Sequence, residues 1–346
     1  MWGIYMNFAR KILIMAIIFN TLALSAACDI NTRNNQERQT SATNSNSLQH
    51  ENKRDLILGF SQIGDESEWR SANTQSIKTA AKDAGIELIF SDAYQQQQNQ
   101  IDAIRSFINQ RVDVIAFSPI VETGWDEVLN EAKDAGIPVF ITDRKIQTND
   151  ESLYVTCIGA DFEEEGRKAG NWLVNKLKNF KRTINIFELE GTSGSTPMLG
   201  RKEGFDQVIS KYPGLKIVGS ADGEFLRSKG KEIIESVLKS KKYKIDVLFS
   251  HNDDMALGAI RAFEEYGIKP GKDVIIISVD AVREAFDAMI AGKLNCTVEC
   301  NPLLGSQLMN TIIAYFNGIP IPKRTIIQEG IFTQENAKTE ISGRKY

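Results

Sequence analysis

Two side-chain pairs stand out as candidates for ligand chemistry. Trp69 and Arg70 lie side by side in the polar segment after the first aliphatic run, and Asp143 and Arg144 directly follow the run Ile137–Thr142. An indole covers the apolar C–H face of a sugar ring, while a guanidinium donates to its hydroxyl groups. An aspartate beside an arginine adds an acceptor to a fork of donors, which suits vicinal hydroxyls. Both pairs therefore favour a sugar ligand; a packed Trp beside a solvated Arg, and an ion pair within the chain, are the alternatives.

Two later segments offer polar side chains in the same setting. The segment His251–Asp254 follows the aliphatic run Val247–Ser250, and its Asn252 can both donate and accept hydrogen bonds. We expect one of the two aspartates after Asn252 to cap a helix that begins near Met255. Asp280 ends a further run and presents another carboxylate. Each of these segments thus carries groups that can bind hydroxyls.

A regular alternation of aliphatic runs and amphipathic stretches must position these segments. The runs are continuous rather than alternating in polarity, which is typical of parallel strands covered by helices on both faces. They form two series, at 55–61, 86–91, 112–117 and 137–142, and at 183–189, 215–220, 245–250, 273–280 and 294–299, separated by helical stretches such as 161–179 and 227–240. The sequence therefore predicts an α/β fold of two lobes with parallel sheets. Because the carboxyl ends of parallel strands meet at one crevice, the polar side chains above should lie together there.

A short repeat supports this architecture. The sequence AKDAGI at Ala81–Ile86 recurs at Ala132–Ile137. In each copy we expect the Gly to adopt the left-handed conformation that ends a helix, and the Ile to open the next strand. The repeat is architectural and carries no chemistry.

Composition excludes several classes of protein. The chain has 346 residues, 42% hydrophobic and 25% charged, so it can form a sizeable core and is neither wholly disordered nor a multi-span membrane protein. Its length suggests about two domains. Its net charge of −4 gives no positive field to hold nucleic acid. Four cysteines without paired spacing and two histidines argue against a disulfide scaffold, a paired-cysteine zinc site and a His-rich metal site.

The first 54 residues have the features of a targeting segment and a tether. Basic residues precede an apolar run, 12–27, that is too short to span a bilayer comfortably and is typical of a signal peptide. Small residues lead into Cys28 and resemble a bacterial lipoprotein processing site, so we expect 1–27 to be removed and Cys28 to be lipidated. Plain secretion, with cleavage before Cys28, is the alternative. The polar stretch 28–54 is expected to be a disordered tether.

Other chemistries fit less well. The stretch Gly191–Ser195 nearly matches the nucleophile elbow of hydrolases, but a Ser replaces its final Gly. A serine hydrolase that uses Ser193 and His251 is therefore a remote alternative. His251 with Asp253 and Asp254 can be drawn as a metal site, although such spacing at a helix start is more often capping. The Lys-Ser or Lys-Thr of a phosphate-binding loop does not occur after a suitable Gly.

Longer motifs are distributed along the whole body of the chain. They are Gly59–Gln62, Glu66–Arg70, Gln97–Ile101, Ala103–Phe107, Thr123–Trp125, Asp143–Arg144, Arg227–Lys231 and His251–Met255. With these motifs, residues 55–346 resemble the type I periplasmic substrate-binding proteins of ABC sugar importers, in the ribose, galactose and galactofuranose group. The resemblance implies two Rossmann-like lobes joined by three hinge crossovers, with a sugar in the cleft between lobes that close around it.

The resemblance also places the lobe boundaries and the site. The crossovers would lie near residues 160–161, 300–301 and 331–332, giving an N-terminal lobe of 55–160 plus 301–331 and a C-terminal lobe of 161–300 plus 332–346. The ligand contacts would be Glu66, Trp69, Arg70, Asp143 and Arg144 from the first lobe, and Arg201, Phe225, Asn252 and Asp280 from the second. The chain departs from the family pattern at 196–200 and at Ala281, where a Gly is usual. Cys300 lies near the cleft, where ribose binders usually place an amide.

The residues and the resemblance together imply a lipid-anchored, monomeric solute receptor in the periplasm or outside the cytoplasm. It would bind a monosaccharide, galactofuranose-like or a related pentose or hexose, and deliver it to the permease of an ABC transporter, with no catalysis, cofactor or metal. A sugar-sensing subunit that signals to a chemoreceptor or sensor kinase is the alternative. A repressor core of the same fold is disfavoured, because a signal peptide takes the place of DNA-binding helices.

Overall fold

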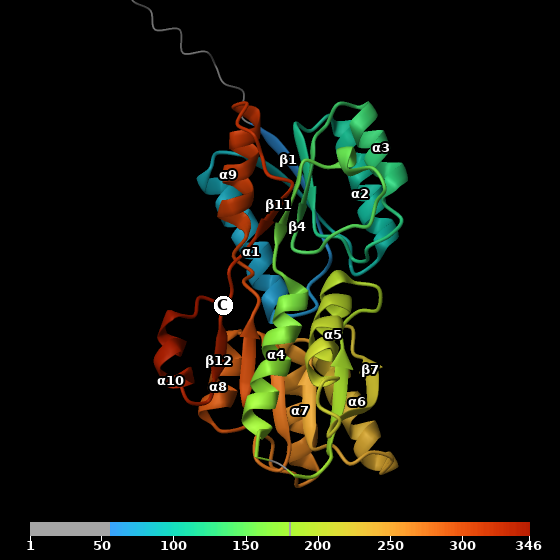
Figure 1. Ribbon diagram of the computed structural model, residues 1–346. Coiled ribbons are helices and arrows are strands. Elements are labelled where there is room, and N and C mark those ends of the chain that lie inside the picture. Colours follow the sequence, from blue (N-terminus) through green and yellow to red (C-terminus); the bar gives the residue numbers. More distant parts are fainter. Residues whose placement is uncertain (1–55, 180) are drawn as a thin grey trace, which may run out of the picture. The chain divides into compact units, whose positions relative to one another are not determined.

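The computed structural model describes residues 56–179 and 181–346 (Figure 1). The expected signal peptide, the lipidation site Cys28 and the tether lie outside the described residues. In the part of the chain that is described, no helix combines the length and the apolar composition that crossing a membrane requires. The described residues form two lobes, each built on a six-stranded sheet.

The N-terminal lobe has an all-parallel sheet in the order β11-β5-β4-β3-β1-β2. Its strands are β1 (Ile57–Gln62), β2 (Glu87–Asp92), β3 (Val114–Phe117), β4 (Val139–Thr142), β5 (Thr156–Gly159) and β11 (Arg324–Ile326). Its helices are α1 (Glu68–Asp83), α2 (Gln97–Gln110), α3 (Asp126–Asp134) and α9 (Gly305–Phe316), with a 3-10 turn, η1 (Glu151–Leu153). The pair α1 and α9 covers one face of the sheet, and the pair α2 and α3 covers the other (Figure 1).

Coverage of both faces explains the continuous aliphatic runs. Val114 of β3 packs with Ile77 of α1, whereas the next residue, Ile115, packs with Phe107 of α2. Successive strand residues point to opposite faces, so a strand covered on both sides needs an apolar residue at every position. The predicted α/β class, with parallel sheets flanked by helices, is confirmed.

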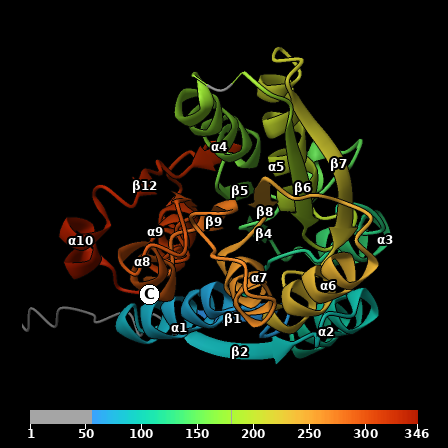
Figure 2. The ribbon, with the colours of Figure 1, turned by 90° about the horizontal axis from the view of Figure 1, so that it is seen from below.

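The C-terminal lobe repeats this plan in the order β12-β10-β9-β8-β6-β7. Its strands are β6 (Ile184–Glu190), β7 (Leu215–Asp222), β8 (Val247–Ser250), β9 (Ile275–Asp280), β10 (Cys296–Glu299) and β12 (Ile331–Thr333). Its helices are α4 (Phe162–Leu177), α5 (Thr196–Ile209), α6 (Arg227–Ser240), α7 (Asp253–Glu265), α8 (Arg283–Ile290) and α10 (Ala337–Glu340), followed by the 3-10 turn η2 (Ile341–Gly343). All neighbouring strands are parallel except β12, which runs antiparallel to β10. Helix α4 packs beside α5, and α6 beside α7 (Figure 2).

Each predicted aliphatic run corresponds to a strand, but three strands have no predicted counterpart. These are β5, β11 and β12, which read TCIG, RTI and IFT and contain no continuous aliphatic run. Without such a run nothing local marks a strand, and their pairing depends on residues far away in the chain. The repeat behaves as predicted, because Gly85 and Gly136 follow α1 and α3 with φ angles of 67° and 72°.

The chain passes between the lobes three times. The first passage joins β5 to α4, the second joins β10 to α9, and the third joins β11 to β12. The third lies at 327–330, before the boundary expected at 331–332. Ile331 already pairs with Val298 of β10, so the expected boundary falls inside a strand of the C-terminal lobe. The family resemblance placed the boundary there, and the three residues of β12 are too few to show a strand pattern that would have corrected it.

Glycines let α4 and α5 pack at backbone distance. A Cβ atom on Gly204 of α5 would lie 1.9 Å from the carbonyl oxygen of Glu163, and one on Gly166 of α4 would lie 2.2 Å from that of Arg201. Neither position can hold a side chain unless the helices separate. This approach brings Glu165 of α4 next to Arg201 of α5, a pair that belongs to the site described below.

Gly204→Ala should lower the free energy of unfolding by about 1 to 3 kcal/mol, because the added methyl group forces two helix backbones apart. Gly214→Ala is the matched control, since a Cβ there meets its nearest atom, the carbonyl oxygen of Arg182, only at 3.9 Å. Urea denaturation followed by circular dichroism measures both variants. A Gly204 variant as stable as the wild type would contradict the close packing.

Candidate functional site

A cavity of about 290 Å³ lies between the lobes, where the strands of both sheets end. All of its lining residues except Ser67 are buried. They are Glu66, Ser67, Trp69, Arg70, Asp143, Arg144, Phe162, Pro197, Arg201, Phe225, Asn252, Asp280 and Cys300. Every side chain that the sequence analysis expected at the ligand is among them, and Cys300 also lies where it was expected.

Three lining residues were not singled out from the sequence. Phe162 begins α4 directly after the first passage between the lobes, and Ser67 is the N-cap of α1, where its Oγ accepts from the Arg70 N–H at 3.1 Å. Pro197 lies in the first turn of α5. Their positions next to a lobe crossing or at a helix start were the available signals, but Phe, Ser and Pro carry no distinctive binding chemistry by themselves.

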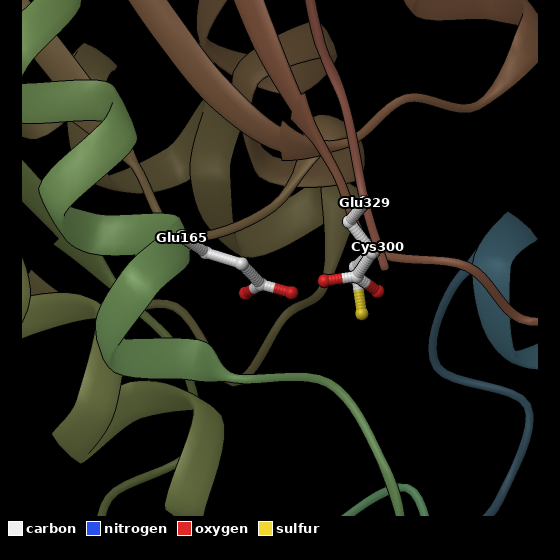
Figure 3. Close-up of side chains that lie close together, drawn as sticks. All are labelled: Glu165, Cys300 and Glu329. Carbon is white, nitrogen blue, oxygen red and sulfur yellow. The ribbon is translucent and has the colours of Figure 1, made fainter. Parts of the chain in front are cut away.

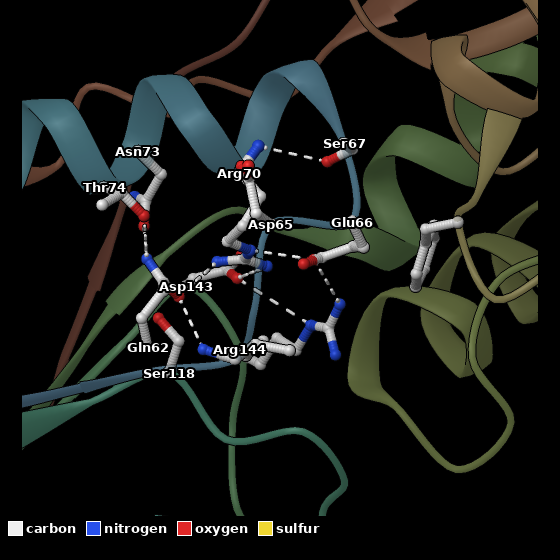
Figure 4. Close-up of polar contacts among 12 residues, drawn as sticks. Gln62, Asp65, Glu66, Ser67, Arg70, Asn73, Thr74, Ser118, Asp143 and Arg144 are labelled. Carbon is white, nitrogen blue, oxygen red and sulfur yellow. Dashed lines mark hydrogen bonds and ion pairs between the residues drawn. The ribbon is translucent and has the colours of Figure 1, made fainter. Parts of the chain in front are cut away.

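Arg70 organises the N-terminal side of the cavity (Figure 4). Its Nε donates to Glu66 Oε1 at 2.9 Å and its Nη2 to Asp143 Oδ2 at 2.7 Å. Its Nη1 donates to Gln62 Oε1 at 3.3 Å. The guanidinium also lies over the Trp69 ring, 4.6 Å from the ring centroid. Arg70 is therefore fully engaged within the protein, and it holds two carboxylates at the cavity wall.

Arg144 is much less fully paired. Its Nη1 donates to the Ile120 carbonyl at 3.0 Å, but Glu66 Oε1 and Asp143 Oδ2 lie 3.7 and 3.8 Å from its other nitrogens. Among the described residues, neither Arg144 Nε nor Glu66 Oε2 has a hydrogen-bond partner, although both atoms are buried. Burial, together with the charge of Arg70, lowers the pKa of Arg144 to about 10. A donor and an acceptor are thus available to a ligand at the same wall.

Trp69 connects the N-terminal lobe to the second passage. Its Nε1 donates to the carbonyl of Cys300 at 2.6 Å, and its ring packs in the same apolar cluster as Phe162 and Phe225 of the C-terminal lobe. The indole therefore gives the cavity an apolar surface whose orientation is set by a hydrogen bond.

Arg201 is the centre of the C-terminal side. Its Nε donates to Glu165 Oε2 at 2.7 Å, its Nη2 to Asp280 Oδ1 at 3.4 Å, and its Nη1 to the carbonyl of His251. Its guanidinium lies 5.9 Å from the centroid of Phe225, and that of Arg144 lies 5.3 Å from the same ring. Burial raises the pKa of Asp280 well above its ordinary value, against the opposing charge of Arg201.

The N-cap of α7 is Asn252 and not, as expected, one of the two aspartates after it. Asn252 Oδ1 accepts from the Met255 N–H at 3.0 Å, and its Nδ2 donates to the Phe225 carbonyl at 3.0 Å. Asp253 turns inward and accepts from Thr297 Oγ1 and from Val282 N, both at 2.8 Å. The expectation was wrong because these partners belong to distant segments.

Several site residues have left-handed backbone conformations. Asp143, Phe225 and Asp280 have φ angles of 60°, 62° and 120°, and Ala281 has one of 62°. Such angles are unfavourable for residues other than Gly and persist only where the surrounding structure imposes them. Ala281 therefore occupies the conformation for which a Gly is usual at this position.

Direct contacts join the lobes around the cavity. The Glu68 N–H at the start of α1 donates to Asp254 Oδ2 of α7 at 2.8 Å. Elsewhere at the interface, the N–H of Lys145 donates to Thr196 Oγ1 at 3.2 Å. The Glu122 N–H donates to the Gly194 carbonyl at 3.2 Å. The lobes are thus in contact beside the cavity.

The hydrolase and metal alternatives do not assemble among the described residues. Ser193 donates to Asp222 Oδ2 at 2.6 Å on the surface. His251 is buried, with Nε2 2.9 Å from Glu188 Oε1 and Nδ1 accepting from the Gly191 N–H at 3.4 Å. Ser193 and His251 are therefore each engaged with other groups, and Asp253 points away from the His251 ring to its own partners.

Comparisons with known proteins agree with this architecture. The family model of the periplasmic binding protein domain matches residues 58–319. The galactofuranose-binding protein YtfQ of Escherichia coli is 42% identical over 293 residues, which cover 84% of this chain and 92% of that protein.

Two solved structures are similar over the same range. A Mycobacterium smegmatis protein in complex with β-D-fucofuranose is 52% identical, with a TM-score of 0.82, and covers 84% of this chain and 95% of its own. The periplasmic binding protein component of the arabinose ABC transporter of Shewanella sp. ANA-3, bound to α- and β-L-arabinofuranose, is 49% identical, with a TM-score of 0.80, and covers 84% of this chain and 96% of its own. Two parallel-sheet lobes around a shared cavity, and matches over most of the body, show that the chain belongs to the family of periplasmic binding protein domains.

Proposed function

We propose that this chain is the solute-binding component of an ABC sugar importer and binds one neutral monosaccharide, in furanose form, between its lobes. The observation that carries the proposal is the convergence of polar and aromatic side chains from both lobes on one buried cavity. Arg144 Nε and Glu66 Oε2 are buried there without protein partners, so a hydroxyl-bearing ligand would satisfy both.

Cavity size favours a single sugar unit. The space among the lining residues is about 290 Å³, including its opening to solvent. Hydrogen bonds join the lobes beside it, from the Glu68 N–H to Asp254 and from the Lys145 N–H to Thr196. So small a space between joined lobes favours one sugar unit over a longer chain of sugars.

The charges of the wall favour a neutral ligand. Arg70 is paired with Glu66 and Asp143, and Arg201 with Glu165 and Asp280, so carboxylates already compensate the guanidinium groups. An added carboxylate or phosphate would face these acidic groups, whereas hydroxyls can donate to the carboxylates and accept from Arg144. Trp69 and Phe225 supply the apolar surfaces against which the C–H faces of a sugar ring pack.

The ligands of the relatives support the furanose form. YtfQ is named for galactofuranose, and the two solved structures hold fucofuranose and arabinofuranose. We extend this ring preference to the present chain, with a galactofuranose-like sugar or a related pentose or hexose as the ligand. Transfer of the sugar to a permease, and the absence of catalysis, belong to the same proposal.

A pair of locked rings tests the preference. Both 1,4-anhydro-D-galactitol, a furanose ring, and 1,5-anhydro-D-galactitol, its pyranose counterpart, lack the anomeric hydroxyl, so neither can change its ring form. If the cavity prefers furanose rings, the 1,4-anhydro compound should raise the melting temperature of the protein more than the 1,5-anhydro compound does. A ligand at about 100 times its Kd should add roughly 2.7 kcal/mol of stability. The same thermal-shift screen should include galactose and arabinose. If no sugar in it shifts the transition, the proposed ligand class is wrong.

Loss of either cavity side chain should weaken binding. We expect Trp69→Ala and Arg144→Ala each to cost about 2 kcal/mol or more in sugar affinity, because each removes a buried contact and leaves its partners unmatched. Tyr212→Ala and Arg261→Ala are matched surface controls in the C-terminal lobe and should bind as the wild type does. Isothermal titration calorimetry measures all four variants; wild-type affinity in both cavity variants would reject the site.

The anchor is tested separately from the cavity. We propose that Cys28 is the lipidated N-terminus of the mature protein, so cells grown with radiolabelled palmitate should label the wild type and leave Cys28→Ser unlabelled. The wild type should also sediment with membranes. Processing at the same position without label would instead favour plain secretion.

A further inference from the structure

Three side chains of the described structure come together where the lobe passages meet. Glu165 lies in the first turns of α4, Cys300 in the second passage and Glu329 in the third. Figure 3 shows the Glu165 carboxylate pointing toward Glu329 and Cys300. One carboxylate oxygen from each Glu and the Cys300 sulfur all lie within 4.8 Å of one another. Two carboxyl groups thus lie next to each other beside the cavity.

The hydrogen bonds of this pair leave one oxygen without an ordinary donor. Glu329 Oε1 accepts from the Asn301 N–H at 2.8 Å, and Glu165 Oε2 accepts from Arg201 Nε at 2.7 Å. Glu165 Oε1 is buried and accepts from no N–H or O–H group of the remaining described residues. Because the Glu165 carboxylate points toward Glu329, a proton on Glu329 would satisfy this oxygen (Figure 3).

Several charged and titratable groups lie around Glu329. Glu165 of α4, Arg201 of α5 and Cys300 of the second passage interact electrostatically with its carboxyl group, and Lys168 of α4 bonds to its backbone. Glu299 of β10, with its partner Arg344, bonds to the N–H of the adjacent Gly330, and Asp280 of β9 acts on Cys300. Lys168 donates to the backbone carbonyl of Glu329 and not to its carboxyl group. Arg201 bonds directly to Glu165 and not to Glu329, so the nearest guanidinium is paired with Glu165.

Two ionised carboxylates at this distance in a buried setting would repel each other strongly. Burial and the charge of Glu165 accordingly raise the pKa of Glu329 to about 10. A shared proton is therefore the arrangement that accounts for both the geometry and the orphaned oxygen.

We propose that Glu329 keeps its proton at neutral pH and donates a hydrogen bond to Glu165 Oε1. Glu329 is then a positioning residue for the ligand cavity. Through this bond the third passage holds Glu165, Glu165 holds Arg201 Nε, and Arg201 forms part of the cavity wall. Glu329 does not line the cavity, and its effect on the ligand is transmitted through Glu165 and Arg201.

The first test needs no ligand and compares the wild type with Glu329→Gln. The amide keeps an acceptor for the Asn301 N–H and a donor for Glu165 Oε1, but it cannot ionise. Because the folded-state pKa of Glu329 is raised, its stabilising contribution is complete below about pH 4.5 and is lost as the pH rises toward about 10. We compare the equilibrium constants for folding of the two proteins. The ratio of the wild-type constant to that of Glu329→Gln should fall by up to about tenfold per pH unit between pH 6 and pH 9.

Urea denaturation at each pH gives these constants. Glu340→Gln, which removes an exposed carboxylate from the same terminal region, is the matched control and should follow the wild type at every pH. Parallel curves for the wild type and Glu329→Gln would overturn the proposal.

The second test uses sugar affinity and so rests on the proposed function. At pH 7, Glu329→Gln should bind sugar as the wild type does, whereas Glu329→Ala should bind at least about tenfold more weakly, because Glu165 loses its donor. Between pH 7 and pH 10 the wild type should lose affinity relative to Glu329→Gln. Any titration of Arg144 affects both proteins alike and cancels from the ratio of their two sugar affinities.

The outcomes separate the two proposals. If no sugar binds any variant at any pH, the proposed function fails and the stability comparison still decides the role of Glu329. If Glu329→Gln binds as weakly as Glu329→Ala, the positioning role is wrong. If a chelator destabilises the wild type and Zn²⁺ restores it, while Glu329→Gln responds to neither, a cation occupies the place of the proton and the proposal is overturned.

Discussion

The burial of three arginine side chains at one interface is the constraint on which this structure depends. A guanidinium removed from water is tolerated only with compensating charge and hydrogen bonds. Arg70 and Arg201 each obtain two carboxylates, one set from each lobe, and these sets form opposite walls of the cavity. Arg144 has no such close set, and its buried Nε has no partner among the described residues. Most polar groups of the cavity wall are thus already paired within the protein, and a ligand would supply hydrogen bonds to the few that are not.

The two lobes supply these groups by different means. On the N-terminal side, Glu66 directly precedes Ser67, the N-cap of α1, and Arg70 lies in the first turn of that helix, so the local chain brings the two together. On the C-terminal side, Arg201 of α5 reaches Glu165 of α4 only because glycines let the two helices touch backbone to backbone. Packing that looks purely architectural therefore determines the electrostatics of the site.

The passages between the lobes are part of the same network. The Trp69 indole bonds to the carbonyl of Cys300 in the second passage, and Glu329 of the third bonds to the Asn301 N–H. The segments that must bend when lobes move apart are thus tied directly to residues of the cavity wall. Direct hydrogen bonds therefore link the position of the lobes to the geometry of the cavity wall.

The sequence by itself determined the α/β class, the helix and strand alternation and six of the cavity residues, because continuous aliphatic runs and polar strand ends are local patterns. These six are Trp69, Arg70, Asp143, Arg144, Asn252 and Asp280. Motif resemblance added Glu66, Arg201, Phe225 and Cys300, which local chemistry alone did not mark. The tertiary structure decided what no local pattern encodes. It made Asn252 the cap of α7 by giving Asp253 distant partners, placed Ile331 in the C-terminal sheet through its pairing with Val298, and imposed left-handed angles on Asp143 and Asp280. It also brought Glu329 to Glu165 across 164 positions of the chain (329 − 165). Each of these depends on contacts between segments far apart in sequence, and such contacts exist only once the chain is folded.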